Sequence, residues 1–447
     1  MNGTTPLYRA LMDGGMSRRT ALALLGAGAT LPWTGRGGFA QDVGGMFQLL
    51  TEDTDDPEIA WYKARVEAFT ASHPGVQVAY DAVGMSGLFE KLTTALAAGQ
   101  PPDMVAGSGL SRVATLAKLG VLQPVDDIVE AIGRDDFMPG MVDQFTWDGQ
   151  VLAVPVQTLS FPYWFRRDLL EQAGLAEPRT WDDLLNVAKT LTRDGVYGIC
   201  LPGGVNTATA RQVLIYFRQG GGNILDADGT IVINSAENRA TLEFMKELYQ
   251  YSPPGASNFG FGDLLTNFQS GICASTYYSG RMLQRVSARA PAIAPSLGCV
   301  FPPYKSVRFT YTEPRGAYIL AGARNRDAAK AWMVEEQFEA GRHIDWLLTA
   351  PGNNLPVRTS IATDARYTGH ELLSARADVL AVLLNATETP GNFYKESHEH
   401  APNPVGGSLD TGPVLPTMLQ RYVFGNESAE TVLSWAAEQI DDMLQNI

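Results

Sequence analysis

The sequence predicts an α/β protein that holds a small molecule at the ends of its strands. Three segments carry this prediction, because each passes from an apolar strand through a loop of small, polar or aromatic residues into a helix: 102–125, 196–214 and 271–283. In the first of them, 104–106 would form a buried strand and 111–119 an amphipathic helix. Ligands of α/β sheets bind outside the carboxyl ends of strands, where such loops gather.

The first forty residues predict an export signal. Ser17-Arg18-Arg19 precedes a short apolar stretch, 21–31, and small residues allow cleavage near Ala40. This stretch is too short to span a bilayer, which takes about 20 residues. The paired arginines favour the twin-arginine route over the general route or a helix of the mature fold, although Ala21 stands where a bulky apolar residue is usual. A soluble periplasmic protein is expected, with Met1 or Met16 as its start.

Composition excludes several classes of protein. A chain of 447 residues suits two domains, and 45% hydrophobic with 18% charged residues supports a core. The net charge of -14 argues against nucleic acid, which needs clustered basic residues. Three cysteines exclude a full disulfide framework; Cys273 and Cys299 could form one bridge, but three buried thiols are preferred. Eight Trp and sixteen Tyr suit a cleft that stacks on sugars.

The first part of the mature chain alternates strands and helices. A strand at 46–50 leads through a polar loop to a helix that Pro57 begins and 73–75 end. A strand at 76–80 and a helix at 88–98 come before the 102–125 unit. Asp148-Gly149 is typical of a hairpin turn and precedes a strand at 151–156.

The later part is predicted to be mostly helical. Thr180 and Asp183 form a near capping box at the start of a helix. Asn234 or Ser235 caps a helix that runs to Tyr249. The remaining predicted elements are a strand with a turn in 266–280, a strand at 317–321, and helices at 327–338, 371–384 and 428–444, the last with an apolar stripe.

Short motifs in a characteristic order connect the chain to a known family. They are Phe69 with His73-Pro74-Gly75-Val76, the alanine-rich 95–105, 119–124, Trp147-Asp148-Gly149 with Val154-Pro155, the 168–184 segment with Thr180-Trp181-Asp182-Asp183-Leu184, Phe268-Gln269-Ser270-Gly271, and 328–332. With these motifs the chain resembles the extracellular solute-binding proteins of ABC importers, in the group that includes the maltose- and other carbohydrate-binding receptors.

The resemblance implies the two-lobe periplasmic binding protein fold of type II, with each lobe a mixed sheet flanked by helices. The chain would cross between lobes near 155–160, 302–305 and 353–356, giving an N-terminal lobe of 41–155 plus 305–352 and a C-terminal lobe of 156–304 plus 353–447. Such a protein captures a sugar or sugar-like solute by hinge closure and delivers it to the transmembrane subunits of a permease. A monomer without cofactor, metal or catalytic residues is expected.

Residues for the ligand are carried over by position. Sugar hydroxyls require planar acceptors and donors, and sugar C–H faces require aromatic rings. The candidates are Asp53, Asp55, Asp56, Ser86, Ser108, Ser111, Gln157, Thr158, Ser160, Tyr163, Asn206, Thr207, Arg211, Tyr277, Tyr278, Arg281, Glu313, Arg315, Asn353 and Asn354. Asp56 could equally serve to cap the helix that Pro57 begins, and Ser86 could equally cap the helix that it starts. Arg281 stands where relatives often have a stacking Trp, so an aromatic platform must come from Tyr277 or Tyr278.

Three alternatives stay open. Arg281 and Arg315 together would suit a phosphorylated or carboxylated solute, held by paired guanidiniums. An exported glycosidase-like enzyme is the second, because paired carboxylates abound, although the motifs of other hydrolases and nucleotide-binding proteins are absent from the sequence. A chemoreceptor that reads the closed form is the third. His398-Glu399-His400 could hold a metal, but a solvated turn is the preferred interpretation.

Overall fold

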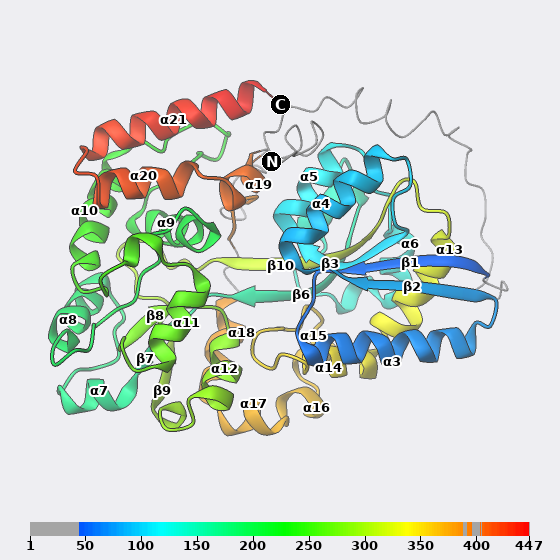
Figure 1. The fold of residues 1–447 in the computed structure, drawn as a ribbon, viewed down its shortest axis with the longest axis horizontal. Helices are drawn as coiled ribbons and strands as arrows, with labels where there is room; N and C mark the ends of the chain where they lie inside the picture. The colour runs from blue at the N-terminus through cyan, green and yellow to red at the C-terminus, as the bar shows by residue number, and fades with distance from the viewer. Residues whose placement is uncertain (1–43, 388–390, 396–402, 404, 447) are drawn as a thin grey trace.

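The computed structural model describes residues 44–387, 391–395, 403 and 405–446, which form two lobes joined by two long strands (Figure 1). The predicted export signal and His398-Glu399-His400 lie outside the described residues. Within the described ranges, no helix combines the length and the apolar character that crossing a membrane requires. The α/β fold class and the two-lobe architecture are confirmed.

The first lobe is built on a five-stranded sheet of order β2-β1-β3-β10-β6. Strands β1 (Gly45–Thr51), β2 (Val76–Ala82) and β3 (Met104–Gly109) are parallel, whereas β10 (Thr312–Ile319) runs antiparallel to both β3 and β6 (Val154–Ser160). The structure differs from the prediction at two strand boundaries. Strand β3 continues through the small residues expected as a loop, and β10 begins before 317, because Gly109 and Arg315 pair with each other.

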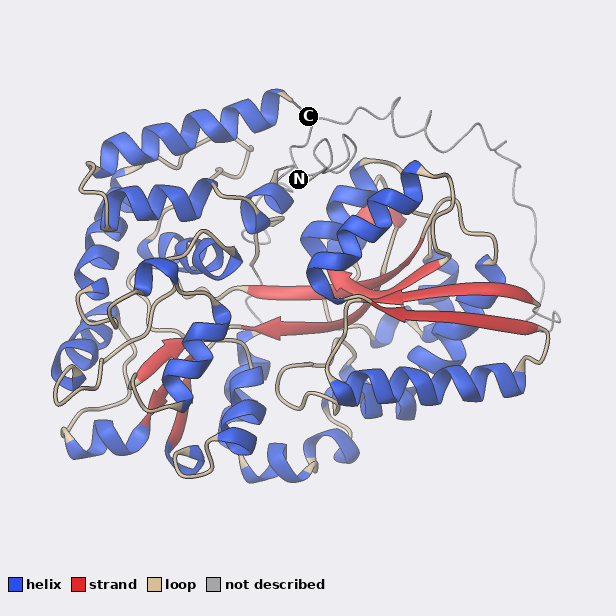
Figure 2. Cartoon of the chain, in the orientation of Figure 1, coloured by secondary structure: helices blue, strands red, loops and turns tan. Residues whose placement is uncertain are grey.

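Helices cover both faces of this sheet (Figure 2). They are α3 (Asp56–Ser72), α4 (Gly84–Ala97), α5 (Leu110–Lys118), α6 (Asp126–Ile132), α13 (Arg326–Ala331) and α14 (Ala340–Leu347). Phe47 of β1, Phe69 of α3 and Trp332 pack together, with ring centroids 5.5–6.3 Å apart. The helix predicted at 327–338 becomes α13 followed by a π-helical segment, Trp332–Gln337.

The second lobe has a small antiparallel sheet, in which β7 (Tyr163–Arg166) lies between β8 (Ser275–Tyr277) and β9 (Leu297–Val300). Helices α7 (Arg167–Gln172), α8 (Trp181–Leu191), α9 (Thr207–Gly220), α10 (Ala236–Tyr249), α11 (Phe261–Gln269), α12 (Arg281–Arg289), α18 (Ala377–Ala386), α19 (Gly406–Thr411), α20 (Val414–Val423) and α21 (Ala429–Gln445) surround it. The expected capping box is confirmed, since Asp183 N–H donates to the Thr180 hydroxyl and Thr180 N–H to the Asp183 carboxylate.

Several local predictions for this part of the chain were wrong or open. The strand expected after Val196 is reduced to isolated bridges, Tyr197 with Cys273 and Cys200 with Thr276. The helix expected at 371–384 is broken into α17 (Glu371–Ala375) and α18 at Arg376, whose guanidinium donates to the Leu297 carbonyl. All three cysteines are buried free thiols, so the alternative bridge between Cys273 and Cys299 is not formed.

The connection between the lobes consists of β6 and β10, which run side by side from one lobe to the other (Figure 1). A third strand segment joins them where Thr158 and Leu355 exchange backbone hydrogen bonds of 3.1 and 3.0 Å. The segment before β10 still belongs to the second lobe: Tyr304 N–H donates to the Arg179 carbonyl and Ser306 N–H to that of Gln219. The second crossing is therefore made by β10 itself, after the 302–305 turn.

A buried histidine supports the crossing strands at a bulge. The pairing of β10 with β6 shifts between Arg315 and Gly316, opposite Val156. His343 of α14 donates its Nε2–H to the Val156 carbonyl at 2.8 Å. Burial, against a weaker effect of this hydrogen bond, lowers the pKa of His343 to about 4. The neutral imidazole thus holds the irregular backbone in place.

We expect His343 to make the fold sensitive to acid. Its pKa is lower in the folded than in the unfolded chain, so the unfolded chain binds the extra proton first. Stability is then full above about pH 6.5 and is lost as pH falls toward 4, by at most about 3 kcal/mol. Urea unfolding at several pH values should show this loss for the wild type but not for His343→Gln. The half-exposed His370→Asn variant should keep the loss; an acid response unchanged by His343→Gln would contradict the assignment.

Candidate functional site

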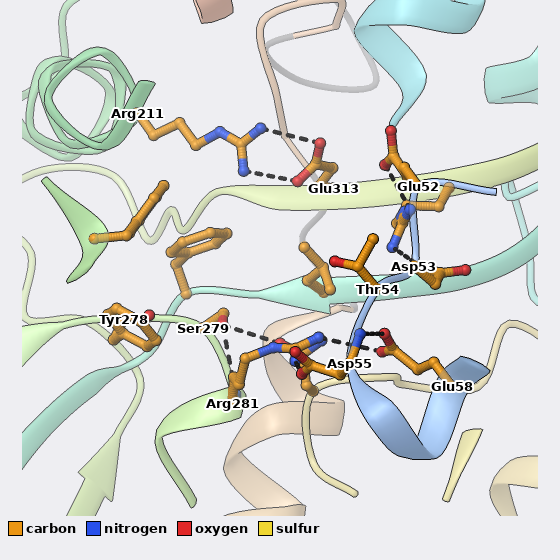
Figure 3. A pocket seen from close by; sticks show the side chains of 15 residues that line it. Glu52, Asp53, Thr54, Asp55, Glu58, Arg211, Tyr278, Ser279, Arg281 and Glu313 are labelled. Carbon is orange, nitrogen blue, oxygen red and sulfur yellow. Dashed lines mark hydrogen bonds and ion pairs between the residues drawn. The ribbon is translucent and has the colours of Figure 1, made fainter. Parts of the chain in front are cut away.

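A cavity of about 340 Å³ lies between the lobes, beyond the carboxyl ends of β1 and β6 (Figure 3). This is the place where open α/β sheets bind ligands. Its lining residues are Glu52, Asp53, Thr54, Asp55, Glu58, Leu159, Phe161, Arg211, Phe261, Tyr278, Ser279, Arg281, Glu313, Arg315 and Asn353. The first lobe supplies the acidic side chains that follow β1, and the second lobe supplies the aromatic rings.

The acidic loop after β1 is shaped by the start of helix α3. Asp55 is the N-cap, and its N–H donates to the Glu58 carboxylate at 3.3 Å in a capping box. Pro57 follows at the second helical position. Asp56 is the first helical residue, points to solvent and does not line the cavity. Capping geometry therefore turns two carboxylates, those of Asp55 and Glu58, toward the cavity.

Arg315 of β10 holds two of the acidic side chains that line the cavity. Its Nη1–H donates to Asp53 at 3.0 Å and its Nη2–H to Glu52 at 2.5 Å. Arg112 also donates to Glu52, at 2.8 Å. Burial opposes the charge of Arg315, but the carboxylates of Asp53 and Glu52 offset this and raise its pKa. The guanidinium is therefore permanently charged and fixed by two carboxylates.

A second buried guanidinium comes from the other lobe. Arg211 of α9 makes bidentate pairs with Glu313 of β10, at 2.7 and 3.0 Å, and with Asp410 of α19, at 2.8 and 3.0 Å. Burial works against the charge of Glu313, yet Arg211 holds its pKa below the usual value. Gly109 leaves space for the Glu313 carboxylate, because a Cβ at position 109 would lie only 2.4 Å from it. The cluster ties α9 and α19 to a crossing strand.

Ion pairs also connect the two lobes directly at the rim of the cavity. Arg281 of α12 donates to Asp55 and also reaches Glu58 at 3.4 Å (Figure 3). Arg285 of the same helix donates to Asp55 as well. The Arg285–Asp55 distance is 2.8 Å. We name these four side chains the rim cluster. It places helix α12 of one lobe against the N-terminus of helix α3 of the other.

The loop before α12 is held by close contacts. Ser279 donates its hydroxyl to the Asn353 side chain at 2.9 Å, and Trp164 donates its Nε1–H to the Tyr278 carbonyl at 2.9 Å. At Gly280 a Cβ would lie 1.7 Å from the Gly352 carbonyl, so only glycine permits this approach. Tyr278 and Asn353 are thereby brought to the same wall of the cavity.

Burial strongly perturbs the ionisation of Glu58, one of the carboxylates that line the cavity. Its side chain is only 4% exposed, and its contacts with Arg281 and the Asp55 N–H are both longer than 3.2 Å. Burial, together with the nearby charge of Asp53, raises the pKa of Glu58 to about 7. The guanidiniums of Arg281 and Arg315 act in the opposite direction, but they offset this rise of the Glu58 pKa only in part.

The cavity brings together eight of the twenty candidates: Asp53, Asp55, Arg211, Tyr278, Arg281, Glu313, Arg315 and Asn353. These residues come from segments far apart in the sequence, on both lobes. Sequence reasoning found them because it followed strand ends and the expected crossings. Their role in holding a ligand stays a prediction.

The other candidates whose side chains are described do not line the cavity, for local reasons. Asn206 caps α9 by accepting from Ala208 N–H at 3.0 Å. Tyr163 and Tyr277 point into the core of the second lobe, where their rings meet edge to face. Ser160 donates to the Leu383 carbonyl. Ser108, Ser111, Gln157, Thr158 and Asn354 are buried. Thr207 is the first residue of α9, Asp56 is exposed, and the side chain of Ser86 lies outside the described residues.

Sequence reasoning missed seven lining residues: Glu52, Thr54, Glu58, Leu159, Phe161, Phe261 and Ser279. Glu58 could have been found, since its position in the capping box is visible in the sequence as Asp55 followed three residues later by a glutamate. Phe161 belongs to an aromatic run that follows a predicted strand. Nothing local indicates that Phe261 reaches the cavity, because helix α11 is brought there only by the packing of the second lobe.

The structure argues against an anionic solute held by Arg281 and Arg315. Both guanidiniums lie in the cavity wall, but each is already paired with two carboxylates. An anionic group would have to displace those partners. In the described residues, no group of three or more His, Cys, Asp or Glu side chains is arranged for a metal ion.

Comparison with known proteins is consistent with this geometry. Residues 54–354, well over half of the chain, match the family model described as bacterial extracellular solute-binding protein. The chain is 23% identical over 390 residues to a putative ABC transporter periplasmic-binding protein, YcjN of Escherichia coli (strain K12), covering 85% of this chain and 88% of the relative. It is 29% identical over 280 residues to a mannitol-binding protein of Pseudomonas aeruginosa, covering 60% of this chain and 63% of that protein.

A solved structure shows the same fold. The maltose-bound MalE3 protein of T. maritima superposes with a TM-score of 0.74 over 89% of this chain and 99% of that chain, at 22% identity. At this level of identity the likeness concerns the two-lobe architecture alone.

Proposed function

Because the chain belongs to the bacterial extracellular solute-binding proteins, we propose that it is the receptor of an ABC importer for a sugar or a polyol of monosaccharide size. The observation that carries this proposal is the interlobe cavity, which combines carboxylates, guanidiniums and aromatic rings. Such walls suit a hydroxyl-rich ligand, whose hydroxyls need charged acceptors and donors and whose C–H faces need rings.

The size of the cavity supports a small solute. Its volume of about 340 Å³ lies at the lower end of the common range for ligand pockets, about 300–1,000 Å³. Both ends are limited by ion pairs, Arg211 with Glu313 on one side and the rim cluster on the other. A monosaccharide or a hexitol fits this description better than an extended oligosaccharide. The similarity to a mannitol-binding protein agrees with this size.

Hinge bending would give access to the cavity. We place the hinge where β6, β10 and Leu355 pass between the lobes, which moves the second lobe boundary from 305 to the start of β10. Ligand would bind while the lobes are apart, and the rim cluster would form on closure. The closed form of an exported monomer would then dock on the transmembrane subunits of a permease in the cytoplasmic membrane, after loss of the 1–40 segment.

The proposal predicts binding without chemistry. Pentitols, hexitols and monosaccharides should raise the melting temperature of the purified protein, and at least one should bind with a dissociation constant in the micromolar range or tighter in calorimetry. The bound solute should be recovered chemically unchanged. Release of a cleaved product from glycosides would instead support the glycosidase-like alternative, for which the raised pKa of Glu58 would suit a general acid. A protein that binds none of these solutes would contradict the proposal.

A further inference from the structure

The two walls of the cavity differ in chemistry in a way that narrows the ligand class. The first lobe presents Glu52, Asp53, Asp55 and Glu58, and the crossing strand adds Glu313. The three lining guanidiniums belong to Arg211, Arg281 and Arg315, so carboxylates exceed them by two. Including the partners just outside the wall, Arg112, Arg285 and Asp410, the excess is still one carboxylate.

The guanidiniums of the wall are not available to an incoming anion. Arg211 is shared by Glu313 and Asp410, and Arg315 by Glu52 and Asp53. Arg281 is shared by Asp55 and Glu58. A carboxylate, by contrast, has about four acceptor sites and can accept further donors after pairing with arginine. The wall therefore offers acceptors in excess of donors.

At Glu58 the negative charge of the wall is only weakly paired. Glu58 is buried beside Asp53, while its two contacts, to Arg281 and to the Asp55 N–H, measure 3.4 and 3.3 Å. The raised pKa that follows from burial and from Asp53 is a sign of incomplete compensation. A cationic group of the ligand would supply the missing positive charge.

The opposite wall is suited to the same kind of group. Phe161, Phe261 and Tyr278 line it, with Tyr278 edge-on to Phe261 at a centroid distance of 5.7 Å. Tyr278 is 8% exposed. In Figure 3 its ring lies at the edge of the cavity, across from the acidic loop. Aromatic rings attract cations as well as sugar C–H groups.

We propose that the preferred ligand is a hydroxylated molecule that carries one protonated amine, such as an amino sugar or an aminoalditol, with the ammonium group on the acidic wall around Glu58 and hydroxyl groups at Tyr278 and Asn353. The proposal rests on the proposed function as a receptor for small hydroxylated solutes. It goes further by specifying the charge of the ligand, which the size of the cavity and the fold of the protein do not determine.

Three ligands with one carbon skeleton test the charge directly. D-glucitol is neutral, 1-amino-1-deoxy-D-glucitol is cationic and D-glucitol 6-phosphate is anionic. Calorimetry at about pH 8, where Glu58 is ionised, should give an affinity at least about tenfold higher for the amine than for the neutral hexitol, and no binding of the phosphate. D-glucose, D-glucosamine and D-glucose 6-phosphate form the equivalent series for a ring, measured at about pH 7, because the amine of D-glucosamine is a weaker base than that of the aminoalditol and loses its proton at about pH 8. Added salt should reduce the advantage of the amine.

Two substitutions in helix α3 test whether the preference for the amine depends on Glu58. Glu58→Gln should reduce the preference for the amine to about twofold or less while the neutral compound still binds, because the amide keeps the shape and the acceptor but not the charge. Glu67→Gln, on the exposed side of the same helix, should change neither affinity. A preference for the amine that survives Glu58→Gln would overturn the assignment of the site.

The wild-type series separates this inference from the proposed function. Equal or tighter binding of the neutral compound in both series would overturn the inference and leave the receptor function intact. Tight binding of either phosphate would overturn it as well, since the guanidiniums would then be available. Failure of all six compounds to bind would count against both the inference and the function on which it rests.

Discussion

Arg211→Ala should destabilise the protein more than any other single substitution in the site, by about 3–5 kcal/mol at neutral pH. Arg211 is 5% exposed and holds two carboxylates, Glu313 and Asp410, each in a bidentate pair. Its removal leaves both negative charges buried without the partner that now compensates them. Because Arg211 and Glu313 both line the cavity, the variant should also lose ligand-induced stabilisation. Urea unfolding with and without a bound solute measures both effects.

The cost of Arg211→Ala should come from the unpaired charges, which a control and a rescue can show. Arg366 pairs with Asp345 at 2.8 Å on the surface, where both side chains are 56% exposed, so Arg366→Ala should cost only about 0–1 kcal/mol. The triple variant Arg211→Met, Glu313→Gln, Asp410→Asn should regain much of the lost stability, because no buried charge remains. A triple variant as unstable as Arg211→Ala would show that shape, and not charge, is responsible.

Local sequence signals were sufficient for the elements that carry the acidic wall. The strand at 46–50, the helix started by Pro57 and the strand at 76–80 all appear as predicted, because apolar periodicity and caps act over a few residues. The same locality explains the placement of Asp55, which is both the N-cap of α3 and a lining residue. Here the requirements of the helix and of the site coincide.

The same signals could not decide between neighbouring or chemically similar residues. Tyr277 ends strand β8 and points into the core, whereas Tyr278 follows the strand and reaches the cavity, so a shift of one position reverses the direction of the side chain. Asn206 has the right chemistry for a sugar, but its side chain is used to cap α9. Candidates near helix starts are therefore ambiguous until the cap is known.

Long-range partners were beyond sequence reasoning. Asp410 pairs with Arg211 across 199 positions of the chain, and the segment around it showed no motif. Arg281 and Arg315 were recognised as a pair of guanidiniums, but their carboxylate partners were not. Those partners decide whether the arginines can bind an anion, and they depend on how the lobes are packed.

Replacing both Arg281 and Arg285 by alanine should shift the protein toward a more open form. These side chains from the second lobe pair with Asp55 and Glu58 of the first, so the proposed opening of the lobes would separate them. If the partly exposed rim cluster contributes about 1–2 kcal/mol to the closed form, its loss changes the ratio of open to closed molecules about 5- to 30-fold. Small-angle scattering should then show a larger radius of gyration at every subsaturating ligand concentration.

The control for the rim cluster is an ion pair within one lobe. Arg326 pairs with Asp127 at 2.8 Å in the first lobe, so Arg326→Ala should leave the scattering profile unchanged. The double variant should also bind its solute more weakly, because apparent affinity falls with the fraction of molecules that can form the complete site. A scattering profile identical to the wild type, together with a reduced affinity, would mean that Arg281 and Arg285 act on the ligand itself and not on the closure of the lobes.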